Sequence, residues 1–444
     1  MTNQKNAPVD RGAVGLIIFM LGLGTLLPWN FFITATEYFE DRLKERTSLG
    51  GTNGTSPATK NYNFASWMTL LAQLPLLLFT LANSFLYQLV REKIRIAVSM
   101  GAILFLFILT AVTVKVEMQP DSFFSVTMAT IWFINSFGAV LQGSLFGMIG
   151  LLPPKYSTLF MSGQGLAGMF ASLASLLSII SNADKATAAL GYFITPCVAT
   201  LVTLLCYLLL PHLEFARFYF VNSKPEATNM LPSSEKEKEA LANVDLDGYK
   251  NKPVLTKGDL EAIGNDDNSR SSVLAVFKKI WVMALCVTCV LAVTLSVFPA
   301  VTVRVKSVYK NKEWDRYFVC VCCFIVFNFM DLIGRSVTCM VQWPTKASRW
   351  FPSLVLARVV FIPLIMFCNT GDRQYILFCH DGAFVAIMTL FALSNGYFIC
   401  LSMSYAPQLV RSKDCETAGA LMTFFLALGL SLGAALSFLL RSMI

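Results

Sequence analysis

The feature that most limits the fold of this chain is the recurrence of long apolar runs along nearly its whole length. Each run holds about 20 or more residues, enough to cross roughly 30 Å of hydrocarbon as an α-helix, whereas a membrane β-barrel would show shorter segments of alternating polarity. The 444-residue chain is 55% hydrophobic and only 14% charged. This composition is far from that of a water-soluble domain and indicates an all-α, polytopic membrane protein.

The runs and the breaks between them predict about eleven membrane-spanning helices. The first run contains Pro28 and Asn30 and is not followed by a small-residue cleavage site, so we expect a retained helix rather than a signal peptide. The predicted segments are 13 to 36, 64 to 88, 96 to 116, 123 to 151, 157 to 181, 188 to 211, 274 to 301, 315 to 341, 352 to 369, 382 to 406 and 415 to 439.

One long polar segment, residues 212 to 273, divides the chain between the sixth and the seventh run. Its charge and its scarcity of large apolar residues beyond its edges predict a largely disordered linker, in which Ser234 and Glu237 are spaced as the capping box of one short helix. The chain then forms an N-terminal bundle of six helices, residues 1–211, and a C-terminal bundle of five, residues 274–444. Two bundles joined in this way are typical of transporters whose binding site lies between the halves near the membrane midplane.

The distribution of Lys and Arg in short loops predicts the orientation. With the N-terminus in the cytosol, most loop cations and the linker are cytosolic, although a cluster from Arg304 to Lys312 disagrees. The loop from 37 to 63 then faces outward and contains an N-glycosylation acceptor at Asn53. An odd number of helices places the C-terminus outside the cell, and the acceptor favours the plasma membrane. The predicted cytosolic cations are Arg91, Lys93, Arg95, Lys155, Lys346, Arg349, Arg411 and Lys413.

The remaining composition argues against several classes of partner. The net charge of +8 comes from cations that are spread over loops and helix ends without a dense patch, so we expect no nucleic-acid partner. Nearly all of the twelve cysteines lie within the apolar runs, where a thiol behaves as a small apolar group. The two histidines, His212 and His380, lie at the ends of runs. We therefore expect no metal site, no cofactor and no histidine-based catalysis.

Two charges interrupt the apolar segment 315 to 341. Asn328, Asp331 and Arg335 are spaced i, i+3 and i+7 and share one helix face. A charge at the centre of a membrane helix costs at least ~2.5 to 3.5 kcal/mol, so such residues face the bundle interior or a water-filled cavity. Either Asp331 and Arg335 form a purely structural ion pair, or the stripe faces a cavity and binds a polar, uncharged solute. Because buried ion pairs are weak stabilisers, we favour the binding site.

Polar residues also lie deep in two N-terminal segments. In 123 to 151, Gly138 and Gln142 share a face with Asn135, and the Gln142 amide suits a nucleobase or another amide edge, unless it bonds a neighbouring helix. In the first run Pro28 removes a backbone hydrogen bond and bends the helix, which places Trp29 near mid-depth. The indole there either stacks on a planar ligand or packs in the core.

Charged residues at the ends of runs suggest a gate. Arg95 opens the third run and Glu416 the eleventh, on the same side and with opposite charges, which predicts a salt bridge that closes an inner gate. We interpret Arg358 as a residue that extends its charge to the membrane surface. Small residues at steps of three and four predict close helix packing in two segments. They are Ser162, Gly165, Gly168, Ser172 and Ser175 in one, and Gly429, Gly433 and Ser437 in the other.

Several ordered motifs resemble those of the equilibrative nucleoside transporters, solute carrier family 29. The resemblance covers the whole length, and stretches such as YSTLF and LPHLEFAR are most like the vertebrate subtype 2. Ile33 also follows the subtype 2 pattern, whereas Gly138 follows the pattern of subtype 1. The motifs are PWNFF (28 to 32), LQGSLFG (141 to 147), SGQGLAG (162 to 168), GYFIT (191 to 195), FNFMDLIGRS (327 to 336), SNGY (394 to 397) and ETAG (416 to 419).

The resemblance implies a fold like the major facilitator superfamily with one helix missing. It implies sodium-independent, facilitative transport of purine and pyrimidine nucleosides, and for subtype 2 also nucleobases, by alternating access. Carried over by position, Asp331 and Arg335 contact the ribose hydroxyls and Gln142 contacts the base. Phe298 and Pro299 lie at an outer gate facing Ile33. The apolar lining of the site is Leu26, Trp29, Ile33, Gln73 and Leu76.

Two alternatives follow from the acidic residues. A proton-coupled symporter would load a proton on Asp331 or Glu416, but Arg335 one turn from Asp331 favours the ionised carboxylate. An intramembrane enzyme would use Asp331 and Glu416 as paired carboxylates, but the two lie at different depths. We therefore expect a transporter and no enzymatic activity.

Overall fold

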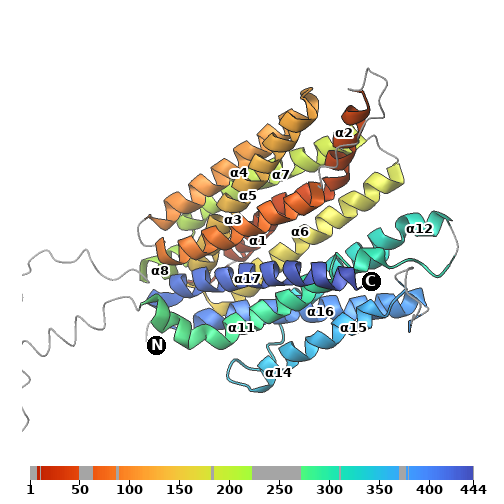
Figure 1. The fold of residues 1–444 in the computed structure, drawn as a ribbon. Helices are drawn as coiled ribbons and strands as arrows, with labels where there is room; N and C mark the ends of the chain where they lie inside the picture. Colours follow the sequence, from red (N-terminus) through yellow and green to blue (C-terminus); the bar gives the residue numbers. More distant parts are fainter. Residues whose placement is uncertain are drawn as a thin grey trace, which may run out of the picture.

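A computed structural model describes residues 8–10, 12–49, 64–86, 90–181, 185–222, 272–309, 312–369, 377, 378 and 380–443. The regular elements within these ranges are helices, as Figure 1 shows. Ten helical segments there are long and apolar enough to cross a membrane, and an eleventh, Trp350–Met366, is shorter. The predicted all-α membrane fold with about eleven spans is thus confirmed.

The helix boundaries lie within a few residues of the predicted segments in most cases. The spanning helices of the N-terminal half are α1 (Ala13–Thr34), α3 (Phe64–Leu86), α4 (Glu92–Lys115), α5 (Pro120–Ile149), α6 (Pro154–Ser181) and α7 (Lys185–Leu209). Those of the C-terminal half are α11 (Val273–Val297), α12 (Lys312–Phe318) continuing through η4 (Val319–Ile325) into α13 (Val326–Val337), α14 (Trp350–Ala357) with η5 (Arg358–Val360) and α15 (Phe361–Met366), α16 (Asp381–Tyr405) and α17 (Cys415–Ser442).

The segment predicted as a linker begins with ordered structure. Helix α8, Glu214–Asn222, follows α7 directly, and the ring of Phe215 packs 5.3 Å from that of Tyr156 and 5.0 Å from that of Tyr219. Phe215, Tyr219 and Phe220 are partly buried and pack against the hydrophobic core, although most of the predicted linker is polar. The rest of the predicted linker, with Ser234 and Glu237, lies outside the described residues, as does Asn53.

The helices run roughly side by side, and successive spans alternate in direction (Figure 1). In the view of Figure 1, α1 to α7 lie in the upper part and α11, α14, α15 and α16 in the lower part. The short helix α2, Thr36–Leu49, lies at the same end as α12, and α8 lies at the opposite end. Helix α1 begins at one end of the bundle and α17 finishes at the other, as an odd number of crossings requires.

Each half of the chain packs mainly on itself. In the N-terminal half α1 packs on α6 and α7, and α5 packs on α3 and α4, around stacked phenylalanines such as Phe32 and Phe39. In the C-terminal half α11 packs on α17 and α16, and α13 packs on α16. The halves meet where α17 contacts α3 and α5 and where α13 and α16 contact α6.

Glycines allow two of these contacts to be very close. A Cβ added at Gly429 of α17 would lie 2.7 Å from the carbonyl oxygen of Thr288 on α11, and one at Gly433 would lie 2.8 Å from that of Ala292. The predicted close packing of the last span is therefore confirmed. Between the halves, a Cβ at Gly419 would lie 2.6 Å from the backbone nitrogen of Gly147 on α5.

We predict that Gly429→Ala destabilises the protein, because the new methyl group meets backbone that has no room to shift, at a cost of about 1 to 3 kcal/mol. The matched control is Gly101→Ala in α4, where an added Cβ has no neighbour within 4 Å and helix propensity favours Ala by up to about 1 kcal/mol. Thermal unfolding in detergent should show a lower midpoint for the first variant only. Equal midpoints for the two variants would contradict this account of the α11–α17 contact.

Candidate functional site

The helix that carries the predicted polar stripe is not a regular α-helix throughout. Between α12 and α13 the backbone forms a π-helical turn, η4, in which Cys320, Cys322 and Cys323 are buried. Such turns are rare and are frequent at functional sites, because the extra residue changes which side chains share a face. The sequence predicted an uninterrupted helix here, and its apolar pattern gives no signal for the turn.

Asp331 and Arg335 form a buried ion pair on α13. Arg335 Nε donates to Asp331 Oδ2 over 2.7 Å, and the two residues are only 9% and 5% exposed. Asp331 Oδ1 accepts a second hydrogen bond of 2.7 Å from Asn395 Nδ2 on α16. Arg335 Nη1 donates to the carbonyl oxygen of Met161 on α6 at 3.3 Å. The pair is therefore bonded to both halves of the chain.

The small residues of α6 face the polar stripe. A Cβ at Gly165 would lie 3.0 Å from Arg335 Cδ, and one at Gly168 would overlap the Asn328 amide oxygen. Asn328 Nδ2 donates to Ser172 Oγ over 2.8 Å. The stripe packs on α6, which has no bulky side chains there and whose backbone approaches closely, and the expectation that the stripe binds a solute stays a prediction. The predicted close packing of α6 is confirmed, and its partner is a row of polar side chains.

The second polar stripe, on α5, keeps an amide without a partner. Asn135 Nδ2 bonds the carbonyl oxygen of Ile131 on its own helix at 2.9 Å. Gln142 is buried, yet its side chain forms no hydrogen bond with any described residue. A Cβ at Gly138, one turn away, would meet nothing within 4 Å. The alternative that Gln142 bonds a neighbouring helix finds no support among the described contacts.

The residues expected to line the site on α1 and α3 are partly buried. Trp29 packs against the aromatic core with its ring stacked 6.1 Å from that of Phe32, at an interplanar angle of 11°. Leu26 and Leu76 are half-buried. Gln73 Oε1 is buried and has no hydrogen-bond partner among the described groups. Two amides of the N-terminal half, Gln73 and Gln142, thus have unused hydrogen-bonding capacity.

The two proposed gates differ in the structure. Arg95 Nη2 lies 2.6 Å from Glu416 Oε1, so the predicted salt bridge between α4 and α17 is present. At the other end, Ile33 is 42% exposed, and Phe298 stacks 3.9 Å from Phe327 of α13. Helices α1 and α11, which precede these positions, are not among the described elements that pack closely on each other. Pro299 follows Phe298 in the turn after α11, and the outer gate stays a prediction.

The interpretation of Arg358 is wrong. Its side chain is only 2% exposed and bonds Ser394 Oγ at 3.0 Å and the carbonyl oxygens of Val290 and Phe391 at 2.9 and 3.2 Å. The short η5 turn between α14 and α15 places Arg358 toward α11 and α16 instead of the membrane surface.

Sequence reasoning also missed Asn395 as a partner of Asp331, although the motif SNGY places it in the middle of an apolar run.

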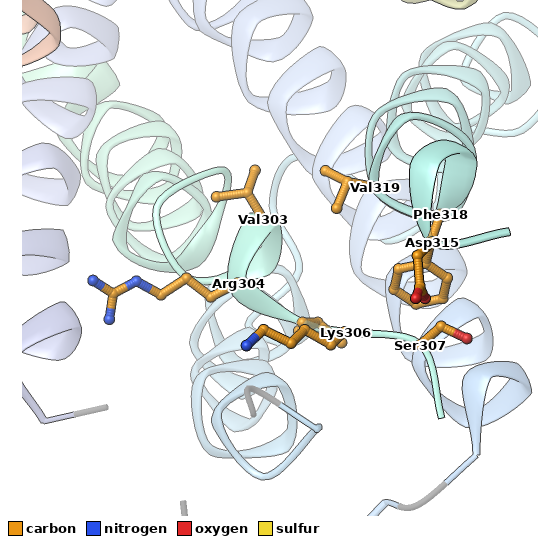
Figure 2. Close-up of a pocket in the computed structure, with 8 residues that line it drawn as sticks. Val303, Arg304, Lys306, Ser307, Asp315, Phe318 and Val319 are labelled. Atoms are coloured by element: carbon orange, nitrogen blue, oxygen red, sulfur yellow. The ribbon is translucent and has the colours of Figure 1, made fainter. Parts of the chain in front are cut away.

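A separate cavity of about 530 Å³ opens beside the turn after α11. Figure 2 shows Val303 and Val319 on its two sides and Asp315 near its rim, with the Arg304 side chain directed away. None of the residues that line this cavity was predicted to contact a solute. The candidate site therefore consists of the α13 stripe with its partners on α6 and α16, and the two free amides on α3 and α5.

Comparisons with known proteins show the family to which the chain belongs. A family model described as nucleoside transporter matches residues 128–442. The chain is 51% identical to human equilibrative nucleoside transporter 2 over 99% of its own length and 100% of that protein. It is 45% identical to human equilibrative nucleoside transporter 1, with 99% of each chain covered.

Solved structures show the same fold at low sequence identity. The proton:xylose symporter XylE of the major facilitator superfamily superposes with a TM-score of 0.62 and 11% identity, over 97% of this chain and 88% of that one. The human organic anion transporter MFSD10 gives a TM-score of 0.52 at 10% identity, over 98% and 95%. The fold is thus that of major facilitator transporters, and the chain belongs to the equilibrative nucleoside transporter family.

Proposed function

We propose that this protein moves purine and pyrimidine nucleosides across a membrane by facilitated diffusion. The observation that carries the proposal is a nearly neutral, buried ion pair on α13 that is bonded to α6, where the two halves of the chain meet. A nucleoside is uncharged and offers vicinal ribose hydroxyls at one end and a planar base at the other. Such a solute needs a few directed hydrogen bonds and a flat apolar wall.

The ion pair retains the capacity to bind a sugar. A carboxylate has about four lone-pair positions, and the described bonds of Asp331 use two of them. A guanidinium has five N–H donors, and those described for Arg335 use two. Asp331 therefore accepts from the ribose hydroxyls while Arg335 donates to them. Asn328 completes this group by exchanging its bond to Ser172 for one to the solute.

The two glutamine amides suit the base. Gln142 is buried without a described hydrogen bond, and Gln73 Oε1 likewise has none, so both amides offer polar atoms to the base. A Cβ added at Gly138 would meet nothing within 4 Å, so we place the base beside this position, one turn from Gln142. Leu26, Trp29, Ile33 and Leu76 supply the apolar wall. Because this half of the site does not involve the sugar, nucleobases are a second class of substrate to test alongside adenosine, uridine and inosine.

Alternating access follows from the contacts between the halves. The Arg95–Glu416 salt bridge and the close approach of Gly419 to Gly147 hold one end of the protein together. We propose that this end is cytosolic, with residues 1–211 and 274–444 as the two rocking bundles joined by the 212–273 linker. The N-terminus is then cytosolic and the C-terminus outside the plasma membrane. Ile33, Phe298 and Pro299 form the gate at the outer end.

We predict that Asp331→Asn and Arg335→Lys each reduce uridine uptake by more than about tenfold per molecule at the cell surface. Asp331→Asn removes the negative charge, and Arg335→Lys removes the planar guanidinium with its forked donors. A buried hydrogen bond to a charged group contributes about 1.5 to 3 kcal/mol. Uptake of labelled uridine, normalised by surface labelling, measures the effect, with Asp315→Asn at the separate cavity as the matched control. Loss of surface protein with unchanged uptake per molecule would show that the pair is only structural.

The salt bridge of the inner gate is tested by exchanging its charges. Arg95→Glu or Glu416→Lys alone places two like charges at the contact and should lower uridine uptake, because the closed inner end is destabilised. The double variant restores opposite charges at the same separation and should recover a measurable part of the lost uptake. If uridine uptake by the double variant is no higher than that of the less active single variant, this pair is not the gate.

A further inference from the structure

Arg358 presents an electrostatic problem. It is among the most buried polar residues of the described chain, and its direct hydrogen-bond partners are all neutral: two carbonyl oxygens and the hydroxyls of Ser394 and Thr294. The ring of Phe391 lies 5.4 Å from the guanidinium carbon and adds a cation–π contact. A buried cation without a counter-charge is expensive, so the nearest anion that balances it has to be identified.

A chain of hydrogen bonds connects Arg358 to Asp331. Arg358 Nη2 donates to Thr294 Oγ1 at 3.1 Å, and Thr294 Oγ1 donates to Asn395 Oδ1 at 2.7 Å. Asn395 Nδ2 then donates to Asp331 Oδ1 at 2.7 Å. We name Arg358, Thr294 and Asn395 the relay. They come from η5, α11 and α16, so three elements of the C-terminal half meet at one carboxylate of α13.

The direction of every bond in the relay is determined by its two ends. An ionised carboxylate only accepts, so the Asn395 amide nitrogen must face Asp331 and its oxygen must face Thr294. Thr294 Oγ1 also lies 2.8 Å from the Val290 carbonyl oxygen, but Thr294 has a single hydroxyl proton and is the only described donor to Asn395 Oδ1. Donation by Thr294 to Asn395 leaves no polar atom of the relay without a partner. Each hydrogen bond is then polarised from the guanidinium toward the carboxylate.

From this geometry we infer that the relay is a set of positioning residues that orient the Asp331 carboxylate toward the substrate sugar. Arg335 holds Oδ2 at the contact with α6, and the relay holds Oδ1 from within the C-terminal half. With both oxygens held, the carboxylate plane is fixed, and its remaining lone pairs have fixed directions. The relay thereby sets how strongly the protein distinguishes a sugar with two vicinal hydroxyls from one without them.

This inference rests on the proposed contact between Asp331 and the ribose, and it makes a prediction about ratios of substrates. Thr294→Val removes the hydroxyl at nearly constant shape, which leaves Asn395 free to rotate and Asp331 poorly oriented. Uptake of uridine should fall, whereas 2′,3′-dideoxyuridine, which lacks both hydroxyls, should be much less affected. The uptake rate of uridine divided by that of 2′,3′-dideoxyuridine should decrease by about fivefold or more, because one hydrogen bond between a ribose hydroxyl and the charged Asp331 carboxylate is misaligned.

Two matched variants separate positioning from general damage. Thr294→Ser keeps the hydroxyl and should retain the wild-type ratio. Thr288 lies on the same helix, but its hydroxyl bonds the carbonyl oxygens of Ala284 and Phe425 instead of the relay. Thr288→Val should therefore leave the ratio of uptake rates unchanged even where total uptake changes. Thr294→Ala provides the same test if Thr294→Val does not reach the cell surface.

The test compares initial uptake rates of the two labelled nucleosides in cells that express each variant at measured surface levels. An equal decrease for both nucleosides in Thr294→Val, or a Thr294→Ser ratio as low as that of Thr294→Val, would overturn the positioning role. If the wild-type protein does not take up uridine, the proposed function is wrong, and this inference is wrong with it. Normal wild-type uptake with an unchanged ratio in Thr294→Val overturns the relay alone.

Discussion

The ion pair between Asp331 and Arg335 is the interaction on which the rest of this structure depends. Two charges in the middle of a membrane helix persist only if they are paired and hydrogen-bonded, because lipid offers neither water nor counter-ions. The pair obtains this environment from two neighbouring helices. Helix α16 supplies Asn395 and approaches through Gly396, where a Cβ would overlap the backbone oxygen of Asp331. Helix α6 supplies the Met161 carbonyl and a surface without bulky side chains.

The same contacts connect binding to movement. Arg335 and Asn328 bond α6 across the boundary between the two halves of the chain, and both groups belong to the proposed sugar site. In the proposed mechanism, a nucleoside that enters there exchanges these bonds for bonds to itself, so binding weakens one contact between the halves. The relay behind Asp331 lies within the C-terminal half and is not broken by such an exchange. The proposed site thus has an Asp331 carboxylate held by the relay and a contact with α6 that breaks when the solute binds.

The sequence predicted those features that depend on local periodicity. Runs of apolar residues predict the helices, and a spacing of i, i+3 and i+7 places Asn328, Asp331 and Arg335 on one face. The Arg95–Glu416 salt bridge was also predictable, because charge and loop position place both residues at one membrane surface. Each of these predictions uses only the position of a residue along its own helix.

The features that were missed depend on how helices rotate and meet. The direction of Arg358 is determined by the short η5 turn, and the partner of Asp331 by the contact between α13 and α16, neither of which is visible in the apolar pattern. The π-helical turn before α13 also changes the face that the stripe presents. The stripe packs on α6 because the glycines of α6 leave room for its side chains. This fit joins segments more than 150 residues apart in the chain, so neither segment predicts it alone.

The central claim is that a charge-paired site of this kind binds an uncharged solute and carries no proton with it. It is tested most directly by the steady-state level of labelled uridine inside proteoliposomes that contain the purified protein. Our account predicts that the internal concentration rises to the external one and no further, with or without an inward proton gradient. Accumulation above the external concentration that is abolished by a protonophore would contradict it.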